Sequence, residues 1–99
     1  MKEQLFSVFD HAAQRFLSPF YSPTIEYAIR QFRATVNTLD HQFNKFPEDY
    51  TLFHLGEFNQ ELGVIKALAS PAPLGVAITM LESNQRPEAV VEKNIFEEV

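Results

Sequence analysis

The chain has 99 residues, a length that predicts one compact domain with enough apolar side chains for a hydrophobic core. A formal net charge of −5 disfavours a strongly basic nucleic-acid wrapper, and the absence of cysteine excludes disulfides, cysteine-ligated metals and thiol catalysis. No apolar run has the ~20 residues of a membrane span, and Glu3 and Gln4 stand where a secretory signal requires apolar residues, so we expect a soluble intracellular protein.

Acidic residues are concentrated at the C-terminal end of the chain, and aromatic residues are unusually numerous. Residues 1–81 carry 6 basic and 8 acidic side chains, whereas residues 82–99 carry 2 basic and 5 acidic ones. We therefore expect a body at 1–81 and an acidic C-terminal tail at 82–99, disordered or forming a short helix. Ten Phe and three Tyr are many for one small domain, so we expect some of them at a partner interface or as stacking platforms.

The first half of the chain predicts a strand and a helix. Residues 5–9 (LFSVF) are apolar on both faces, which is typical of a central strand or one packed under a helix. Residues 12–21 are predicted to be irregular. Ser22 as N-cap and Pro23 at the first helical position then predict a helix over about 23–38.

The predicted helix is amphipathic. Its apolar residues recur at three- and four-residue steps and fall on one face: Ile25, Ala28, Ile29, Phe32, Val36 and Leu39. Its polar residues fall on the opposite side, namely Glu26, Arg30, Arg33 and Asn37. Glu26 and Arg30 are spaced for an ion pair across one helical turn.

The second half predicts a β-hairpin. A polar connection at 40–49, held by Phe43, Phe46 and Pro47, leads into a strand at 50–58. Gly56 inside that strand indicates a bulge or a close approach of another backbone.

A turn at 59–63 is expected next, with Gly63 suited to positive φ, followed by a partner strand at 64–68. Residues 69–73 read as a rigid connector and residues 74–81 as a further strand. The resulting order, β-α-β-β with one additional strand, predicts an α+β fold with one amphipathic helix packed on an antiparallel or mixed sheet.

Signals for catalysis and cofactors are weak. His11, His41 and His54 lack the spacing of a metal motif, and adjacent side chains such as Asp10 and His11 point to opposite faces of a strand. The sequence offers carboxylates at Glu48, Asp49 and Glu57, but it gives no sign that they form a catalytic group. It contains neither a nucleophile motif nor a glycine-rich phosphate loop. We therefore expect no enzyme, no metal and no cofactor.

Cations near aromatic residues suggest a different chemistry. Single-stranded nucleic acid is bound where bases stack on rings and cations follow the phosphates. The residues of this kind are Arg30, Arg33, Arg15, Lys45, Lys66, Phe20, Tyr21 and Tyr27. The alternative is a solvated helix face with ordinary pairing between Arg and Glu.

Three stretches resemble a known family. FLSPFYSP at 16–23, followed by AIRQF at 28–32, is similar to a Y-L-P-P-F…A-I-R-A-F run. FPEDYTLFHLGEF at 46–58 resembles the signature H-P-E-D-Y-x-L-x-x-I-G-E-F, and LGVA at 74–77 resembles a closing S-L-G-V. The family is the small nonstructural protein of gokushovirus-type microviruses, bacteriophages with circular single-stranded DNA genomes. Ser18 and Phe46 depart from its usual Pro and His.

The resemblance implies a non-capsid protein made in the host bacterial cytoplasm, often labelled DNA-binding or assigned to single-stranded DNA synthesis. It implies no catalytic residue. We therefore expect an accessory protein that binds single-stranded DNA or the replication complex. The alternative is an adaptor that binds a viral or host replication factor without touching nucleic acid. The many Phe residues and uncovered sheet edges also predict a homo-oligomer, most simply a dimer.

Overall fold

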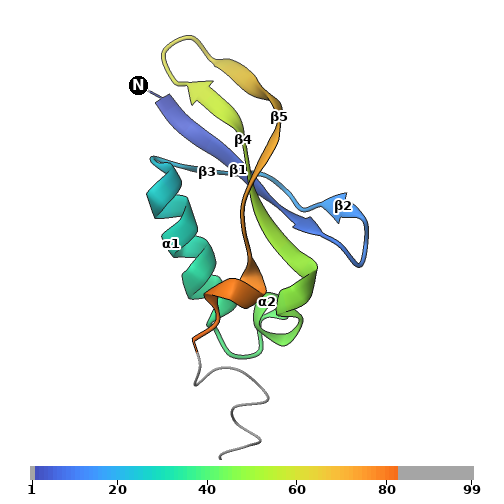
Figure 1. Cartoon of the computed structure of the whole chain (residues 1–99). Coiled ribbons are helices and arrows are strands. Elements are labelled where there is room, and N and C mark those ends of the chain that lie inside the picture. The colour runs from blue at the N-terminus through green and yellow to red at the C-terminus, as the bar shows by residue number, and fades with distance from the viewer. Residues whose placement is uncertain (1, 83–99) are drawn as a thin grey trace, which may run out of the picture.

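The computed structural model describes residues 2–82 and has an α+β fold, as predicted (Figure 1). Five antiparallel strands form one curled sheet, and one long helix packs on it. In chain order the elements are β1 (Lys2–Asp10), β2 (Arg15–Phe16), β3 (Phe20–Ser22), α1 (Ile25–Val36), the single-turn helix α2 (Gln42–Lys45), a 3-10 turn (Pro47–Asp49), β4 (Tyr50–Asn59), β5 (Val64–Val76) and a second 3-10 turn (Ala77–Met80).

Strand β1 lies at the centre of the sheet. It pairs with β4 along its whole length on one side, and with the short strands β2 and β3 on the other. β5 continues the sheet beyond β4 and is its free edge. Strand β1 is longer than the predicted 5–9 because its polar ends are held by pairing with β4 rather than by their own propensity.

The prediction that residues 12–21 are irregular was partly wrong. An Asx turn at Asp10, whose carboxylate accepts from the N–H groups of Ala12 and Ala13, reverses the chain, and β2 and β3 then pair with β1. Strands of two and three residues are too short to show any periodicity. Pairing with an existing strand, which sequence patterns do not reveal, makes them extended.

Helix α1 begins two residues later than predicted. Its N-cap is Thr24, whose hydroxyl accepts from the Tyr27 N–H at 3.0 Å, whereas Ser22 is buried in β3 opposite Gln4. The helix ends at Val36, so Leu39 lies beyond it and is 68% exposed instead of joining the apolar face. The predicted N-cap at Ser22 and the predicted burial of Leu39 were therefore wrong.

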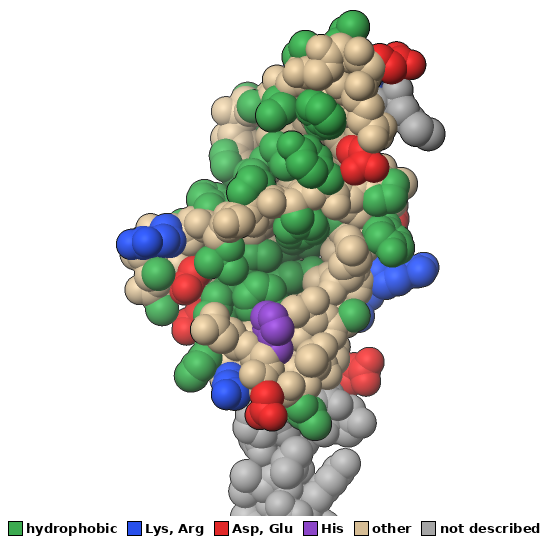
Figure 2. Space-filling model, turned by 180° about the vertical axis from the view of Figure 1, so that it is seen from behind, with side chains coloured by type: hydrophobic (Ala, Val, Ile, Leu, Met, Phe, Trp, Pro, Cys, Tyr) green, Lys and Arg blue, Asp and Glu red, His purple; other side chains and the backbone are tan. Residues whose placement is uncertain are grey.

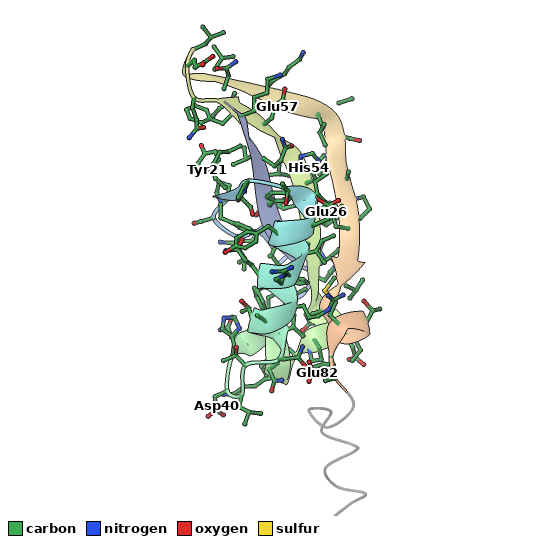
Figure 3. All side chains as sticks on the ribbon, turned by 90° about the vertical axis from the view of Figure 1, so that its left-hand side faces the viewer. Tyr21, Glu26, Asp40, His54, Glu57 and Glu82 are labelled. Carbon is green, nitrogen blue, oxygen red and sulfur yellow. The ribbon has the colours of Figure 1, made fainter. Side chains whose placement is uncertain are left out.

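The core lies between α1 and one face of the sheet (Figure 3). Ala28, Phe32 and Val36 of the helix meet Phe6 and Leu52 of the central strands. The Phe6 and Leu52 side chains are fully buried. Pro47 and the half-buried Phe43 help to close the lower end, but Phe46, which was expected to help, is exposed.

The predicted hairpin is present and longer than expected. Gly63 adopts φ 69°, and a Cβ on Gly56 would lie 2.4 Å from the Lys66 carbonyl oxygen, so the expected close approach of a backbone is confirmed. β5 continues through residues 69–73, which were predicted to be a connector. Proline is tolerated there because β5 is an edge strand. Residues 74–81 were predicted to be a strand, but β5 ends at Val76 and a 3-10 turn follows.

Two further expectations concern the ends and the membrane. The predicted tail at 82–99 lies outside the described residues except for Glu82. Within the described part of the chain, no helix is long and apolar enough to cross a membrane.

Candidate nucleic-acid interface

The outer face of α1 carries an exposed ring followed by two guanidinium groups. Tyr27, Arg30 and Arg33 are spaced by three residues, so each is a surface neighbour of the next along the helix. All three side chains are exposed, and Tyr27 is 45% accessible. Figure 3 looks onto this face, with Glu26 at its N-terminal end. We call Tyr27, Arg30 and Arg33 the α1 stripe.

The cations of the α1 stripe are not neutralised by a described neighbour. The predicted pair between Glu26 and Arg30 does not form, and neither Arg30 nor Arg33 has an ion pair with any residue in 2–82. By contrast, Lys2 lies 3.5 Å from a Glu57 carboxylate oxygen. Both guanidinium groups are therefore free to contact a phosphate, which Arg recognises with two parallel hydrogen bonds.

The other predicted cations lie elsewhere. Arg15 on β2 stands opposite Asp10 in register, and Lys66 on β5 stands opposite Glu57. Lys45 is on α2. Figure 2 shows the basic side chains of one face as separate groups around a hydrophobic hollow. The structure thus brings Arg30 and Arg33 together but leaves Arg15, Lys45 and Lys66 apart from them.

The predicted aromatic residues also separate. The Phe20 ring stacks on Phe6, with centroids 5.6 Å apart, and packs against the core. The Tyr21 ring leans on Phe58 at 5.5 Å. Since Phe20 already has a stacking partner and Tyr21 belongs to another surface, Tyr27 is the predicted ring that accompanies Arg30 and Arg33.

The chain matches the family model described as the Phage ORF5 protein over residues 3–80. It belongs to the Phage ORF5 family. The matched region runs from β1 to the last 3-10 turn and includes the α1 stripe. No curated protein and no solved structure matches the chain significantly. The predicted phage protein is confirmed at this level.

In this ORF5 chain the histidines have local structural roles. His11 Nε2 lies 3.0 Å from Thr51 Oγ1, His41 Nδ1 accepts from the Phe43 N–H, and His54 Nε2 lies 2.8 Å from Gln4 Oε1. Across residues 2–82 no group of three or more His, Asp and Glu side chains is placed to hold a metal ion. Glu57 is near the far end of β4 from Glu48 and Asp49, so the three carboxylates are not assembled.

One titrating group in the body is perturbed. Burial raises the pKa of Tyr50, and the charges of Asp10 and Asp49 raise that pKa further. The Tyr50 hydroxyl donates to Gln42 Oε1 at 3.2 Å, which links β4 to α2. This tyrosine belongs to the core and lies away from the α1 stripe.

Sequence reasoning missed a second aromatic group. Phe9, Phe16 and Phe53 form a ring cluster on the sheet, with centroids 4.8 Å apart for Phe9 and Phe16 and 5.3 Å apart for Phe16 and Phe53. The signal was present, because residues 5–9 are apolar on both faces. That pattern was interpreted as burial within the domain, whereas α1 covers one face of the strand and Phe16 remains exposed on the other.

Proposed function

We propose that this ORF5 family protein is a non-enzymatic accessory protein of a microvirus-type phage that binds single-stranded DNA in the host cytoplasm during viral DNA synthesis. The observation that carries the proposal is the α1 stripe. It offers an exposed ring and two guanidinium groups that have no described carboxylate partner. The phage family assignment supports the biological setting.

The stripe fits single-stranded DNA in its chemistry and spacing. An exposed tyrosine can stack on any base, because every base has a π-face, while arginines three residues apart can contact phosphates along a flexible strand. At roughly 0.7 per phosphate contact, two such contacts give a slope of about −1.4 in a plot of log affinity against log salt. Because the whole chain carries −5, its overall field opposes DNA, so binding depends on these local contacts.

An adaptor for a viral or host replication factor is the second candidate. One observation favours it: an open, mostly apolar groove of about 310 Å³ lies between β3, α1 and α2 (Figure 2). Val8, Phe20, Phe32 and Phe43 line it, and Gln31 and Thr35 supply polar groups. Such a groove suits an apolar side chain of a protein partner.

Fluorescence anisotropy with a labelled single-stranded oligonucleotide, across a salt series, tests the DNA proposal. The double variant Arg30→Ala/Arg33→Ala should bind more weakly to every sequence, and its salt slope should be shallower by about 1.4. The matched control is Arg15→Ala/Lys45→Ala, which removes the same charge from other elements. It should keep most of the affinity. Thermal unfolding of both variants should stay close to that of the wild type, because exposed Arg→Ala changes are mild.

Three results would count against the proposal. Equal losses in the two double variants would show a general charge effect, and an unchanged affinity after removal of Arg30 and Arg33 would exclude the α1 stripe. Failure of the wild-type protein to bind DNA at any salt concentration would reject DNA binding altogether, and the adaptor function would then lead.

A further inference from the structure

The sheet has a second face that no described helix covers. Side chains alternate along a strand, so register with β1 assigns each residue to one face. Phe6 and Val8 face α1, whereas Leu5, Ser7 and Phe9 face the other way. The large side chains on that side, which we call the helix-free face, are Leu5, Phe9, Phe16, Tyr21, Phe53, Phe58 and Ile65. Figures 1 and 3 show α1 against one side of the sheet.

The helix-free face is apolar and accessible. Phe16 is 41%, Tyr21 48% and Ile65 55% exposed. The rings are already arranged against one another: Phe9, Phe16 and Phe53 form one group, and Tyr21 and Phe58 form a second nearer the hairpin tip. This arrangement holds the rings in place before anything binds, so little side-chain entropy is lost on covering them.

The small polar side chains on this face are already satisfied. The Ser7 hydroxyl donates to the Leu17 carbonyl at 2.6 Å, and Thr51 Oγ1 lies 3.0 Å from His11 Nε2. The Ser7 and Thr51 side chains are both buried. An unsatisfied hydroxyl is the usual cost of burying a polar surface. Covering the helix-free face with an apolar surface would avoid this cost, because both hydroxyls keep their partners within the chain.

The charged residues of the strands are almost all on the other side. By register, Glu3 is the one charged residue that the described strands place on the helix-free face. The remaining strand charges share the side of α1: Lys2, Asp10, Arg15, Glu57 and Lys66. A nucleic acid on the helix-free face would find rings but no cation for its phosphates, so the face suits an apolar protein surface better than DNA.

We propose that a second copy of this chain covers the helix-free face, so that two sheets pack face to face in a two-fold dimer. A two-fold interface brings a patch against itself, which requires a surface without a strong charge of one sign. The helix-free face meets that condition although the chain carries −5, because Glu3 is the one acidic residue that the described strands place on it. Paired sheets would interdigitate these rings as in a β-sandwich, roughly 10 Å apart.

The open area is of the right order for a dimer. At roughly 150–250 Å² for a fully buried aromatic side chain, Phe16 and Tyr21 alone leave roughly 60–120 Å² each uncovered. Ile65, the half-buried members of the face and the flanking backbone extend this to several hundred Å². A standard interface covers roughly 800 Å² on each partner. The proposal is independent of DNA binding, because the α1 stripe lies on the opposite side of the sheet.

Light scattering and sedimentation equilibrium test the proposal on the full chain. At about 50 µM the wild type should have twice the 11.4 kDa mass of one chain. Phe16→Glu and Ile65→Glu should each yield monomers, since a buried unpaired carboxylate opposes association. The matched control is Leu39→Glu, an exposed leucine away from the sheet, which should remain dimeric, as should Arg30→Ala/Arg33→Ala.

A wild-type monomer at about 50 µM would overturn the proposal, and so would a dimer that survives both substitutions. If Phe16→Glu fails to fold, Ile65→Glu decides, because the Ile65 side chain is more than half exposed in the single chain. Binding of the labelled oligonucleotide by a wild-type monomer, lost in Ile65→Glu but kept in Leu39→Glu, would assign the helix-free face to DNA and would also overturn the dimer.

Discussion

Both faces of the sheet carry clusters of aromatic side chains, and they differ in what covers them. On the α1 side, Phe6 and Phe32 are buried in the core. On the helix-free face, the Phe9, Phe16 and Phe53 rings contact one another but stay partly or largely accessible. A phenylalanine count therefore does not measure how much core a chain has. The strand pattern indicates which faces are suited to burial, and the tertiary structure determines which face the chain buries itself.

The largest expected effect separates these faces by stability. Phe32→Ala should lower the free energy of unfolding by about 3–5 kcal/mol, because it removes a buried ring from the core. Phe53→Ala on the helix-free face should cost about 1–2 kcal/mol at low protein concentration. Urea unfolding at several concentrations measures both. If the helix-free face pairs two copies, the Phe53 deficit should grow with concentration, whereas the Phe32 deficit should not.

Equal deficits for Phe32→Ala and Phe53→Ala in dilute solution would show that the helix-free face belongs to the core of the single chain. If the loss in the free energy of unfolding caused by Phe53→Ala does not change with protein concentration, the ring cluster does not take part in association.

Two buried serines, one on each face of the sheet, should differ in their contribution to stability. Ser7 and Ser22 are each 1% exposed, but the Ser7 hydroxyl donates to Leu17 whereas Ser22 Oγ has no partner within the described chain. Ser7→Ala should lower the free energy of unfolding by about 1–3 kcal/mol, because it removes the hydrogen-bond donor of the Leu17 carbonyl. Ser22→Ala should be neutral or stabilising, since it removes an unsatisfied buried hydroxyl. Chemical unfolding of the two variants checks this, and a larger loss for Ser22→Ala would contradict it.

The smallest expected effect is a pH dependence on the α1 side. The pKa of Tyr50 in the folded state is raised above its ordinary value of 10.0 by burial and by Asp10 and Asp49. The folded state therefore keeps the phenol proton that the unfolded chain releases, so this stabilisation is complete below about pH 10 and is lost as the pH rises through the folded-state pKa. Tyr50→Phe should flatten that decline in melting temperature. Parallel curves for the two proteins would show that Tyr50 does not contribute.

Much of the fold could be predicted from local signals. The helical spacing of Ala28, Phe32 and Val36, the glycine at the hairpin turn and the strand at 50–58 are properties of short segments, and the structure confirms them. The sequence-based predictions were wrong where contacts between distant parts of the chain determine the local structure. Ser22 and Thr24 are both good N-caps on either side of Pro23, and burial of Ser22 opposite β1 leaves the cap to Thr24. The prolines at 71 and 73 predict a connector, because no local signal shows that the segment is an edge strand.

The candidate site was predictable to a similar extent. The 3.6-residue period places Arg30 and Arg33 on the outer face of α1 from sequence alone. The surroundings of Arg15 and Lys66 follow from strand register, which brings Asp10 and Glu57 opposite them, and no spacing in the sequence encodes that pairing. The stacking of Phe20 on Phe6 also depends on the pairing of β3 with β1. Because the sequence does not reveal that contact, it predicts Phe20 as a stacking residue for DNA.

The central position of β1 has a consequence for how the protein is made. Asp10 pairs with Tyr50 and Lys2 with Asn59, so the two central strands are joined across 40 to 57 residues of chain. The ribosome releases β1 before β4, so at first β1 can pair only with the short strands β2 and β3. Contacts this distant in sequence slow folding, because the loop must close before pairing rewards it. On a nascent chain, β1 therefore gains the neighbour that pairs with its whole length only after β4 has been synthesised.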